Sequence, residues 1–511
     1  MELTLKKNKI PFFKKKADAS TNHEETMEMI VPDSLPDIRE VLDTDGTAVL
    51  RSKECDNGKM IVTGFVRANV VYVPDGGGIS RGLSTQIPFT VTLDAPDVDC
   101  DSRILANSEL SGIEARALNS RKLAIRAFLN VGASAYGESE FSRSPAPDEI
   151  PEDLELLTET CELNPVVDVS EKAFTISDEI PLPPGKPPIS LIIKSNAALV
   201  ADEFRVAGSK LILKGTANIV IVYASMGIAE LSSAILSLPF SEVLDLSDSD
   251  GAENKTFDVT LTATSLYVQE NGGDTATSVS IEISALAQAV VCKRFEASYI
   301  ADAYSTSCEA SCRTEESSVS SLESEQTFKE TVRETLPTAV NPRSVICVRV
   351  FPNGIVRAAD GYGAAFKVTV TYCSDDGQTL TTGGKLNAFF AYPDLPGIDD
   401  IRASATFGEP FAAPVAGGIE VRVPVELHTR IFRSIRVSPV YSVSLDEKQL
   451  TDYTQLPSLV LHRVTTDDTL WELAKRYNST RELIREANEL DSDSAVCGRM
   501  LIISKKRPSI K

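Results

Sequence analysis

The sequence predicts a mainly β protein, in which three tandem β-sandwich or barrel-like repeat domains precede a small β-α-α-β module. Two observations predict the β part. Apolar and polar residues alternate with a period of two, as in "FKVTVTY" and "IEVRVPVEL", and similar β-rich segments recur at a nearly constant spacing. Such alternation places apolar side chains on one face of a strand. The third observation is that near residue 459 the period changes to about 3.6, which is typical of amphipathic helices.

Matched aromatic residues mark the repeat. In each copy a strand ends in a tyrosine, and these are Tyr72, Tyr223 and Tyr372. A phenylalanine follows each tyrosine 17 residues later, at Phe89, Phe240 and Phe389. The tyrosines are 151 and 149 residues apart, and a Leu-Pro pair precedes each copy, at residues 35–36, 182–183 and 336–337. We therefore expect three equivalent units, with these aromatic residues at core or corner positions across neighbouring strands.

The segments outside the repeated units are polar. Residues 1–27 include six lysines within eleven positions. They predict a basic flexible tail that is either solvated or attracted to a membrane surface or an acidic partner. Residues 143–160 and 305–326 are acidic and rich in Pro or Ser, which is typical of exposed linkers. The expected domains are β domain 1 at residues 28–145, β domain 2 at residues 160–305, β domain 3 at residues 328–447 and the C-terminal module at residues 458–505.

From Leu459 onward the pattern predicts strand, helix, helix and strand. The segment "TTDDTLWELAKRY" begins with good capping residues and continues as an apolar stripe, and "STRELIREANEL" forms the second helix. The strands are "LVLHRV" before the helices and "GRMLIIS" after them. Consecutive helical residues point about 100° apart, so Leu470 and Trp471 do not both face squarely inward. We expect Trp471, the only tryptophan of the chain, to be partly exposed.

This C-terminal segment resembles a LysM domain over residues 459–504. The resemblance rests on Val464, the run from Asp467 to Trp471, the triplet Asn488-Glu489-Leu490 and the final "GRMLII". Asp467 replaces a glycine, and Ser504 stands where proline is common. The resemblance implies two loops that flank a shallow binding edge for a protein partner or a glycan. Leu470 either belongs to this edge or completes the small core. The candidate residues of the edge are Asp467, Asp468, Thr469, Leu470, Trp471, Asn488 and Leu490.

Three β units followed by one LysM-like module resemble the SipL-like family of spore coat morphogenetic proteins, whose β units are called SPOCS domains. The segment "VPDSLPDIREVL" at residues 31–42 is similar to the opening of the first unit in that family. The resemblance implies a protein of the mother-cell cytoplasm that joins the spore coat at the forespore surface. It also implies that the LysM-like module docks to the basement-layer coat ATPase SpoIVA, with peptidoglycan as a secondary ligand.

Composition argues against several classes of protein. The net charge of −22 argues against a nucleic-acid-binding protein, which needs a basic face for the phosphates. No apolar run approaches the roughly 18 residues of a membrane span, and the N-terminus lacks the apolar core of a secretory signal, so export is not expected. The nine scattered cysteines are typical of reduced thiols rather than a disulfide or zinc framework.

No motif for catalysis emerges from the sequence. The segment "TTGGKL" at residues 381–386 lacks the hydroxyl residue and the upstream glycine of a phosphate-binding loop, and His428 has no evident nucleophile beside it. We therefore expect a non-enzymatic scaffold of endospore coat assembly, with no catalytic residue, metal or cofactor. The alternative is a cell-wall protein whose module binds the N-acetylglucosamine of peptidoglycan or chitin.

Overall fold

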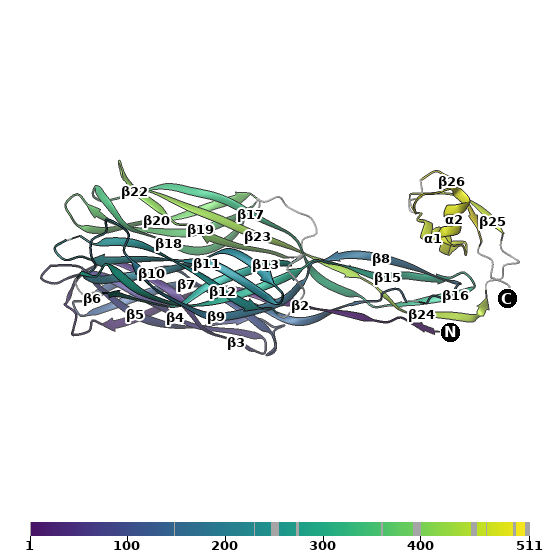
Figure 1. The fold of residues 1–511 in the computed structure, drawn as a ribbon, viewed down its shortest axis with the longest axis horizontal. Helices are drawn as coiled ribbons and strands as arrows, with labels where there is room; N and C mark the ends of the chain where they lie inside the picture. The colour runs from purple at the N-terminus through teal and green to yellow at the C-terminus, as the bar shows by residue number, and fades with distance from the viewer. Residues whose placement is uncertain are drawn as a thin grey trace.

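The structure is a computed structural model. It describes residues 2–147, 149–228, 230–246, 255–271, 275–358, 361–391, 400–450, 457–466, 468–493 and 497–505. The described chain is mainly antiparallel sheet, with two short helices near the C-terminus, and this confirms the predicted fold class. Figure 1 shows a body of long strands at one end, a narrow stalk leaving it, and the small helical module beside the far end of the stalk.

Unit one is a sandwich of two three-stranded sheets, β3-β4-β5 and β2-β7-β6. Its strands are β2 (Asn8–Ile30), β3 (Ile38–Asp56), β4 (Lys59–Pro74), β5 (Arg81–Asp94), β6 (Arg103–Asn119) and β7 (Lys122–Arg143). Alternate residues of β4 and β7 point inward, so Val62 and Val66 meet Leu123 and Ile125 in one buried core. The alternation seen in the sequence is therefore the core face of each strand.

Units two and three repeat this arrangement. Unit two pairs the sheets β10-β11-β12 and β13-β14-β9, and unit three pairs β18-β19-β20 with β17-β23-β21, where β22 also joins β23. The strands of unit two are β9 (Val166–Pro181), β10 (Leu191–Ala207), β11 (Lys210–Ala224), β12 (Ser232–Asp245), β13 (Lys255–Asn271) and β14 (Ser278–Lys293). The strands of unit three are β17 (Ser317–Pro337), β18 (Pro342–Ala358), β19 (Gly361–Ser374), β20 (Thr379–Ala391), β21 (Asp400–Phe407), β22 (Phe411–Val415) and β23 (Gly418–Val437).

The three tyrosines are equivalent, as predicted. Each lies on the middle strand of the first sheet, β4, β11 or β19, and is at most 2% exposed. Opposite each tyrosine the first strand carries the same irregularity, a bulge that inserts Leu42, Ile193 or Ile346. The Tyr72 hydroxyl donates to the Pro36 carbonyl at 3.1 Å, and Tyr223 donates to the Pro187 carbonyl at 3.1 Å. In unit two the matching proline is therefore Pro187, not the Leu-Pro pair at residues 182–183.

The phenylalanines are equivalent in only two units. Phe89 and Phe240 are 3% and 7% exposed, and each ring covers the glycine across from it, Gly64 or Gly215. Phe389 is 45% exposed, so the expected burial of this residue is wrong. The hairpin after Tyr372 is one residue shorter, because Tyr372 pairs with Leu380 whereas Tyr72 pairs with Arg81. A one-residue change of register turns a side chain to the other face of the sheet.

Polar side chains join the three units where their first sheets meet. Asp43, Lys194 and Cys347 occupy equivalent positions, each opposite the residue that precedes the matched tyrosine. The Lys194 ammonium forms ion pairs with Asp43 and, at 3.6 Å, with Asp45, and Arg349 of unit three pairs with Asp45 at 3.2 Å. Burial opposes the charge of Lys194, but Cys347, Asp43 and Asp45 together raise its pKa. Residues from all three units therefore share one buried network.

The stalk is formed by segments from all three units. Its strands are β1 (Glu2–Thr4), β8 (Leu154–Leu163), β15 (Phe295–Ser305), β16 (Cys308–Thr314) and β24 (Val440–Leu450), joined by the ends of β2, β7, β17 and β23 (Figure 1). The expected linker at residues 305–326 is therefore largely strand, and in the one at residues 143–160 the last seven residues are strand. The segment 154–163 pairs with β15, and the segment 308–314 pairs with β24. Main-chain hydrogen bonds and a narrow apolar interior that includes Phe12 and Phe141 hold them together.

The lysine-rich N-terminus is also strand rather than a flexible tail. Residues 8–30 pair with β7 over their whole length. Lys7 and Lys9 form ion pairs with Glu315 and Glu140, and Lys15 pairs with Asp400 at 2.6 Å. Lys16 pairs with Asp99. Acidic residues of the body and stalk thus neutralise much of the cluster, which reduces its attraction for a membrane surface.

Candidate functional site

The C-terminal module has the predicted strand, helix, helix, strand order. Its elements are β25 (Leu459–Arg463), α1 (Leu470–Arg476), α2 (Arg481–Asn488) and β26 (Met500–Ser504), and β25 pairs antiparallel with β26. Leu473 and Ile484 from the helices meet Leu501 and Ile503 of β26, and all four are fully buried. Capping residues in the sequence set where both helices begin. Thr469 and Glu472 form a complete capping box at α1, and Thr480 caps α2.

The loop before α1 is held by a cluster of hydrogen bonds around Asp468. Its carboxylate accepts from His462 Nε2 at 2.8 Å and from both the main-chain N–H and the hydroxyl of Thr465 at 2.8 Å. These hydrogen bonds, first that from His462, hold the pKa of Asp468 well below its ordinary value. Thr469 follows on the exposed side of the loop. Asp467 lies outside the described residues.

Two of the candidate residues support the module from inside. Leu470 is 1% exposed and belongs to the core. The Asn488 amide nitrogen donates to the Ile484 and Ile502 carbonyls at 2.8 and 2.6 Å, and its oxygen accepts from the Ile502 N–H at 2.7 Å. Asn488 therefore joins the end of α2 to β26. Leu490 packs against the same core while remaining partly exposed, so it is the candidate at this end that a ligand can reach.

Trp471 is buried, at 6% exposed, and the expectation of partial exposure is wrong. The stalk covers it. The Trp471 ring meets the Tyr304 ring edge-on with centroids 4.8 Å apart, and its Nε1–H donates to Asp302 at 2.9 Å. On another side the Arg481 guanidinium lies 5.4 Å from the Trp471 ring centre. Helix geometry alone does not decide the exposure of Trp471, because Tyr304 of the stalk joins the buried cluster that contains both Leu470 and Trp471. Asp302 and Tyr304, about 170 positions earlier, are the residues that sequence reasoning missed, since no local pattern marks them.

Two segments of the chain match known protein families. Residues 37–118 match the family model "SipL, SPOCS domain", and residues 462–504 match the LysM domain model. No curated protein and no solved structure gives a match. The chain carries a SipL-type SPOCS domain and a LysM domain. In carrying both, it matches a SipL-like protein, and the two domains support a sporulation coat-related protein with a LysM binding module.

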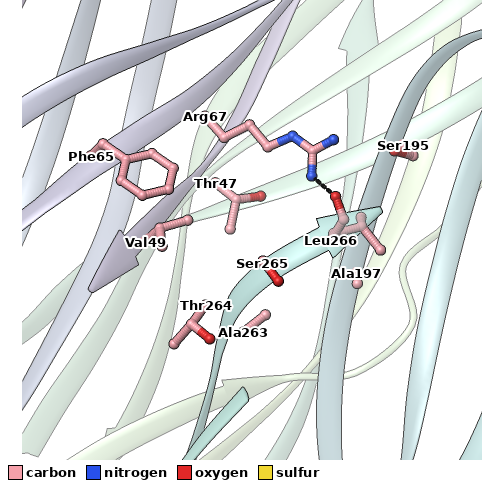
Figure 2. A pocket seen from close by; sticks show the side chains of 10 residues that line it. All are labelled: Thr47, Val49, Phe65, Arg67, Ser195, Ala197, Ala263, Thr264, Ser265 and Leu266. Carbon is pink, nitrogen blue, oxygen red and sulfur yellow. Dashed lines mark hydrogen bonds between the residues drawn. The ribbon is translucent and has the colours of Figure 1, made fainter. Parts of the chain in front are cut away.

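The SPOCS match covers β3 to β6 of unit one, and units two and three repeat the same topology. A small hollow of about 80 Å³ lies between the SPOCS domain and unit two (Figure 2). The Arg67 side chain reaches across it and donates to the Leu266 carbonyl, and burial lowers the pKa of Arg67. Pockets for small ligands typically measure about 300–1,000 Å³. This hollow is therefore a seam between units, in which Arg67 joins one to the other.

Metal sites, membrane-spanning helices and the surroundings of His428 are the other features to consider in the part of the chain that the structure describes. No group of three or more His, Cys, Asp or Glu side chains there is arranged to hold a metal ion, and no helix there has the length and apolar character needed to cross a membrane. His428 contacts Thr327 at 3.1 Å and Thr406 at 3.3 Å, both by side-chain hydrogen bonds. The loops of the LysM domain are thus the best-defined candidate site.

Proposed function

We propose that this protein is a non-enzymatic scaffold of endospore coat assembly. Its LysM domain docks to the basement-layer coat ATPase SpoIVA at the forespore surface, within the mother-cell cytoplasm. The observation that carries the proposal is that a LysM binding domain lies beside the far end of a stalk, with the SPOCS body at the other end (Figure 1). Long antiparallel strands that share an apolar interior form a stiff support for a binding module. One end is then free to hold a partner while the body makes other contacts.

The docking edge consists of the loop that precedes α1 and the loop that follows α2. Thr469 and Leu490 supply the accessible surface, and the buried carboxylate of Asp468 holds the loop before α1 through its bonds with His462 and Thr465. Leu470 and Asn488 hold this edge from beneath, as their burial and hydrogen bonds require. Trp471 adds a large aromatic contact when the LysM domain is not seated on the stalk. The edge therefore presents one accessible apolar residue, Leu490, to a protein partner.

The test compares two leucine variants in the full-length protein. Leu490→Ala removes the accessible apolar residue of the edge, and Leu461→Ala is the matched control, because Leu461 is a 60% exposed leucine on β25 of the same domain. Co-purification with SpoIVA is measured, and circular dichroism verifies that both variants fold. We expect Leu490→Ala to weaken binding about tenfold while Leu461→Ala binds normally. Equal binding by the two variants contradicts the assignment of the edge, and absence of binding by the unmodified protein contradicts the function.

The second candidate function is recognition of N-acetylglucosamine in peptidoglycan. The match to the LysM family itself favours it. Sedimentation of the full-length protein with insoluble peptidoglycan distinguishes the two functions. Binding that chitin oligomers displace supports the glycan function, whereas retention of the protein in the supernatant, together with capture by SpoIVA, supports the scaffold.

A further inference from the structure

The tip of the stalk carries a preformed surface for the LysM domain. Asp302 and Tyr304 lie two residues apart on β15, so their side chains point to the same face. A bulge in the pairing with β8 lies directly before Asp302, between Ile300 and Asp302, and bulges of this kind re-aim the side chains beside them. Leu157, across from Asp302 on β8, adds apolar surface next to Tyr304. We call Leu157, Asp302 and Tyr304 the stalk seat.

The stalk seat fits one face of α1 through both charge and shape. Oδ2 of Asp302 accepts from the Trp471 indole at 2.9 Å and from the Lys475 ammonium at 2.6 Å. Trp471 and Lys475 are four residues apart, so they are neighbours on one face of α1. Oδ1 of Asp302 accepts from the Ala303 N–H at 2.9 Å. Because this bond lies within β15, it orients the carboxylate independently of the LysM domain. The Tyr304 hydroxyl donates to the Ser479 carbonyl at 2.8 Å, just beyond α1.

This contact joins two separately folded parts through few residues. The LysM domain has its own core of Leu473, Ile484, Leu501 and Ile503, and only Tyr304 and Leu157 come to that core from the stalk. Such a small contact with good hydrogen bonds is suited to reversible association. The largest aromatic side chain of the LysM domain, Trp471, is nevertheless only 6% exposed with this contact in place.

We propose that the stalk seat is an autoinhibitory contact, which withholds the Trp471 face of the LysM domain until a protein partner displaces the stalk from it. The proposal rests on the function proposed above and names its regulation. A partner that needs Trp471 binds only those molecules in which the LysM domain has left the stalk seat, called unseated below. The apparent dissociation constant of the partner therefore rises as the unseated fraction of the protein falls. A partner surface that replaces the seat needs an acceptor for the indole and the ammonium, and an aromatic or apolar side chain beside them.

Fluorescence of the full-length protein tests the seat directly, because Trp471 is the only tryptophan. The variant Asp302→Ala/Tyr304→Ala removes the acceptor and the ring. We expect its Trp471 emission to move to longer wavelength and its quenching by acrylamide to increase. Tyr304→Phe loses only the hydroxyl bond to Ser479 and should show a smaller increase. Its matched control is Tyr299→Phe on the same strand, whose hydroxyl bonds Glu159 instead, and this variant should match the unmodified protein.

Binding to SpoIVA tests whether the seat withholds Trp471. A hydrogen-bonded, charged contact of this kind is expected to change the unseated fraction about tenfold or more, so the double variant should bind about tenfold more tightly. Unchanged emission and quenching in the double variant overturn the seat. If Trp471 is exposed in the double variant but SpoIVA binds it no more tightly than the unmodified protein, the stalk seat does not withhold the Trp471 face. If neither protein binds SpoIVA, the proposed function fails and the withholding fails with it, while quenching still decides whether the seat exists.

Discussion

Replacing Phe240 by alanine should destabilise unit two far more than the corresponding change at Phe389 destabilises unit three. Phe240 is 7% exposed, its ring covers Gly215, and it lies against Phe174 with ring centroids 5.5 Å apart. A side-chain atom added at Gly215 would meet the ring at 2.5 Å, so the glycine and the ring are mutually fitted. Removing a buried phenylalanine of this kind typically costs about 3–5 kcal/mol, because a cavity remains.

Phe389 provides the matched control, since it has the same offset from its tyrosine but faces outward. At 45% exposed, it gains only part of the roughly 1.5–3 kcal/mol that full burial of such a side chain contributes. Phe389→Ala should therefore cost about 1 kcal/mol or less. Phe89→Ala in unit one should behave like Phe240→Ala, because Phe89 covers Gly64 in the same way.

Hydrogen exchange followed by mass spectrometry is the appropriate assay, because a chain of several units has no single well-defined unfolding transition. Peptides from β11 and β12 should lose protection in Phe240→Ala, while peptides from β4 and β19 keep most of theirs. Two results would refute the reasoning. One is a loss of protection in Phe389→Ala as large as that in Phe240→Ala. The other is equal loss in all three units when only Phe240 is changed.

Four further predictions concern the buried network, the N-terminal strand and a helix cap. Lys194→Met leaves Asp43 and Asp45 buried beside fewer positive charges and should cost about 3–5 kcal/mol, seen as faster hydrogen exchange in β3 and β10. Burial opposes the charge of Asp45, yet Arg349 and Lys194 lower its pKa. Its contribution is therefore present above the ordinary aspartate pKa and lost as pH falls below it, which acid unfolding of the unmodified protein should show, with a smaller loss in Asp45→Asn. Deleting residues 1–20 removes most of a paired strand and should raise proteolysis of the stalk, whereas a flexible tail would leave it unchanged. Thr469→Ala removes a cap and should lower the stability of the LysM domain by about 1 kcal/mol, seen as faster exchange in α1.

The sequence alone determined the features that depend on near neighbours along the chain. Period-two alternation requires strands with one buried face, so it predicted sheets but left both a sandwich and a barrel open. The three tyrosines could be matched because each copy keeps the same middle strand and the same bulge opposite it. Capping residues fixed the start of both helices to within a residue or two, and the β-α-α-β order of the LysM domain was predicted correctly.

Tertiary structure decided the features whose partners lie far along the chain. The polarity of residues 1–27 suggested a tail, but main-chain pairing with β7 does not depend on side-chain polarity, and acidic residues up to several hundred positions away neutralise the lysines. One residue fewer in a hairpin turned Phe389 outward, and the spacing to its tyrosine could not reveal this. Trp471 lies in the core cluster of its own domain, and Asp302 and Tyr304 from the distant stalk complete its burial. Local periodicity fixes which way a side chain points, whereas the long-range contacts decide what it meets there.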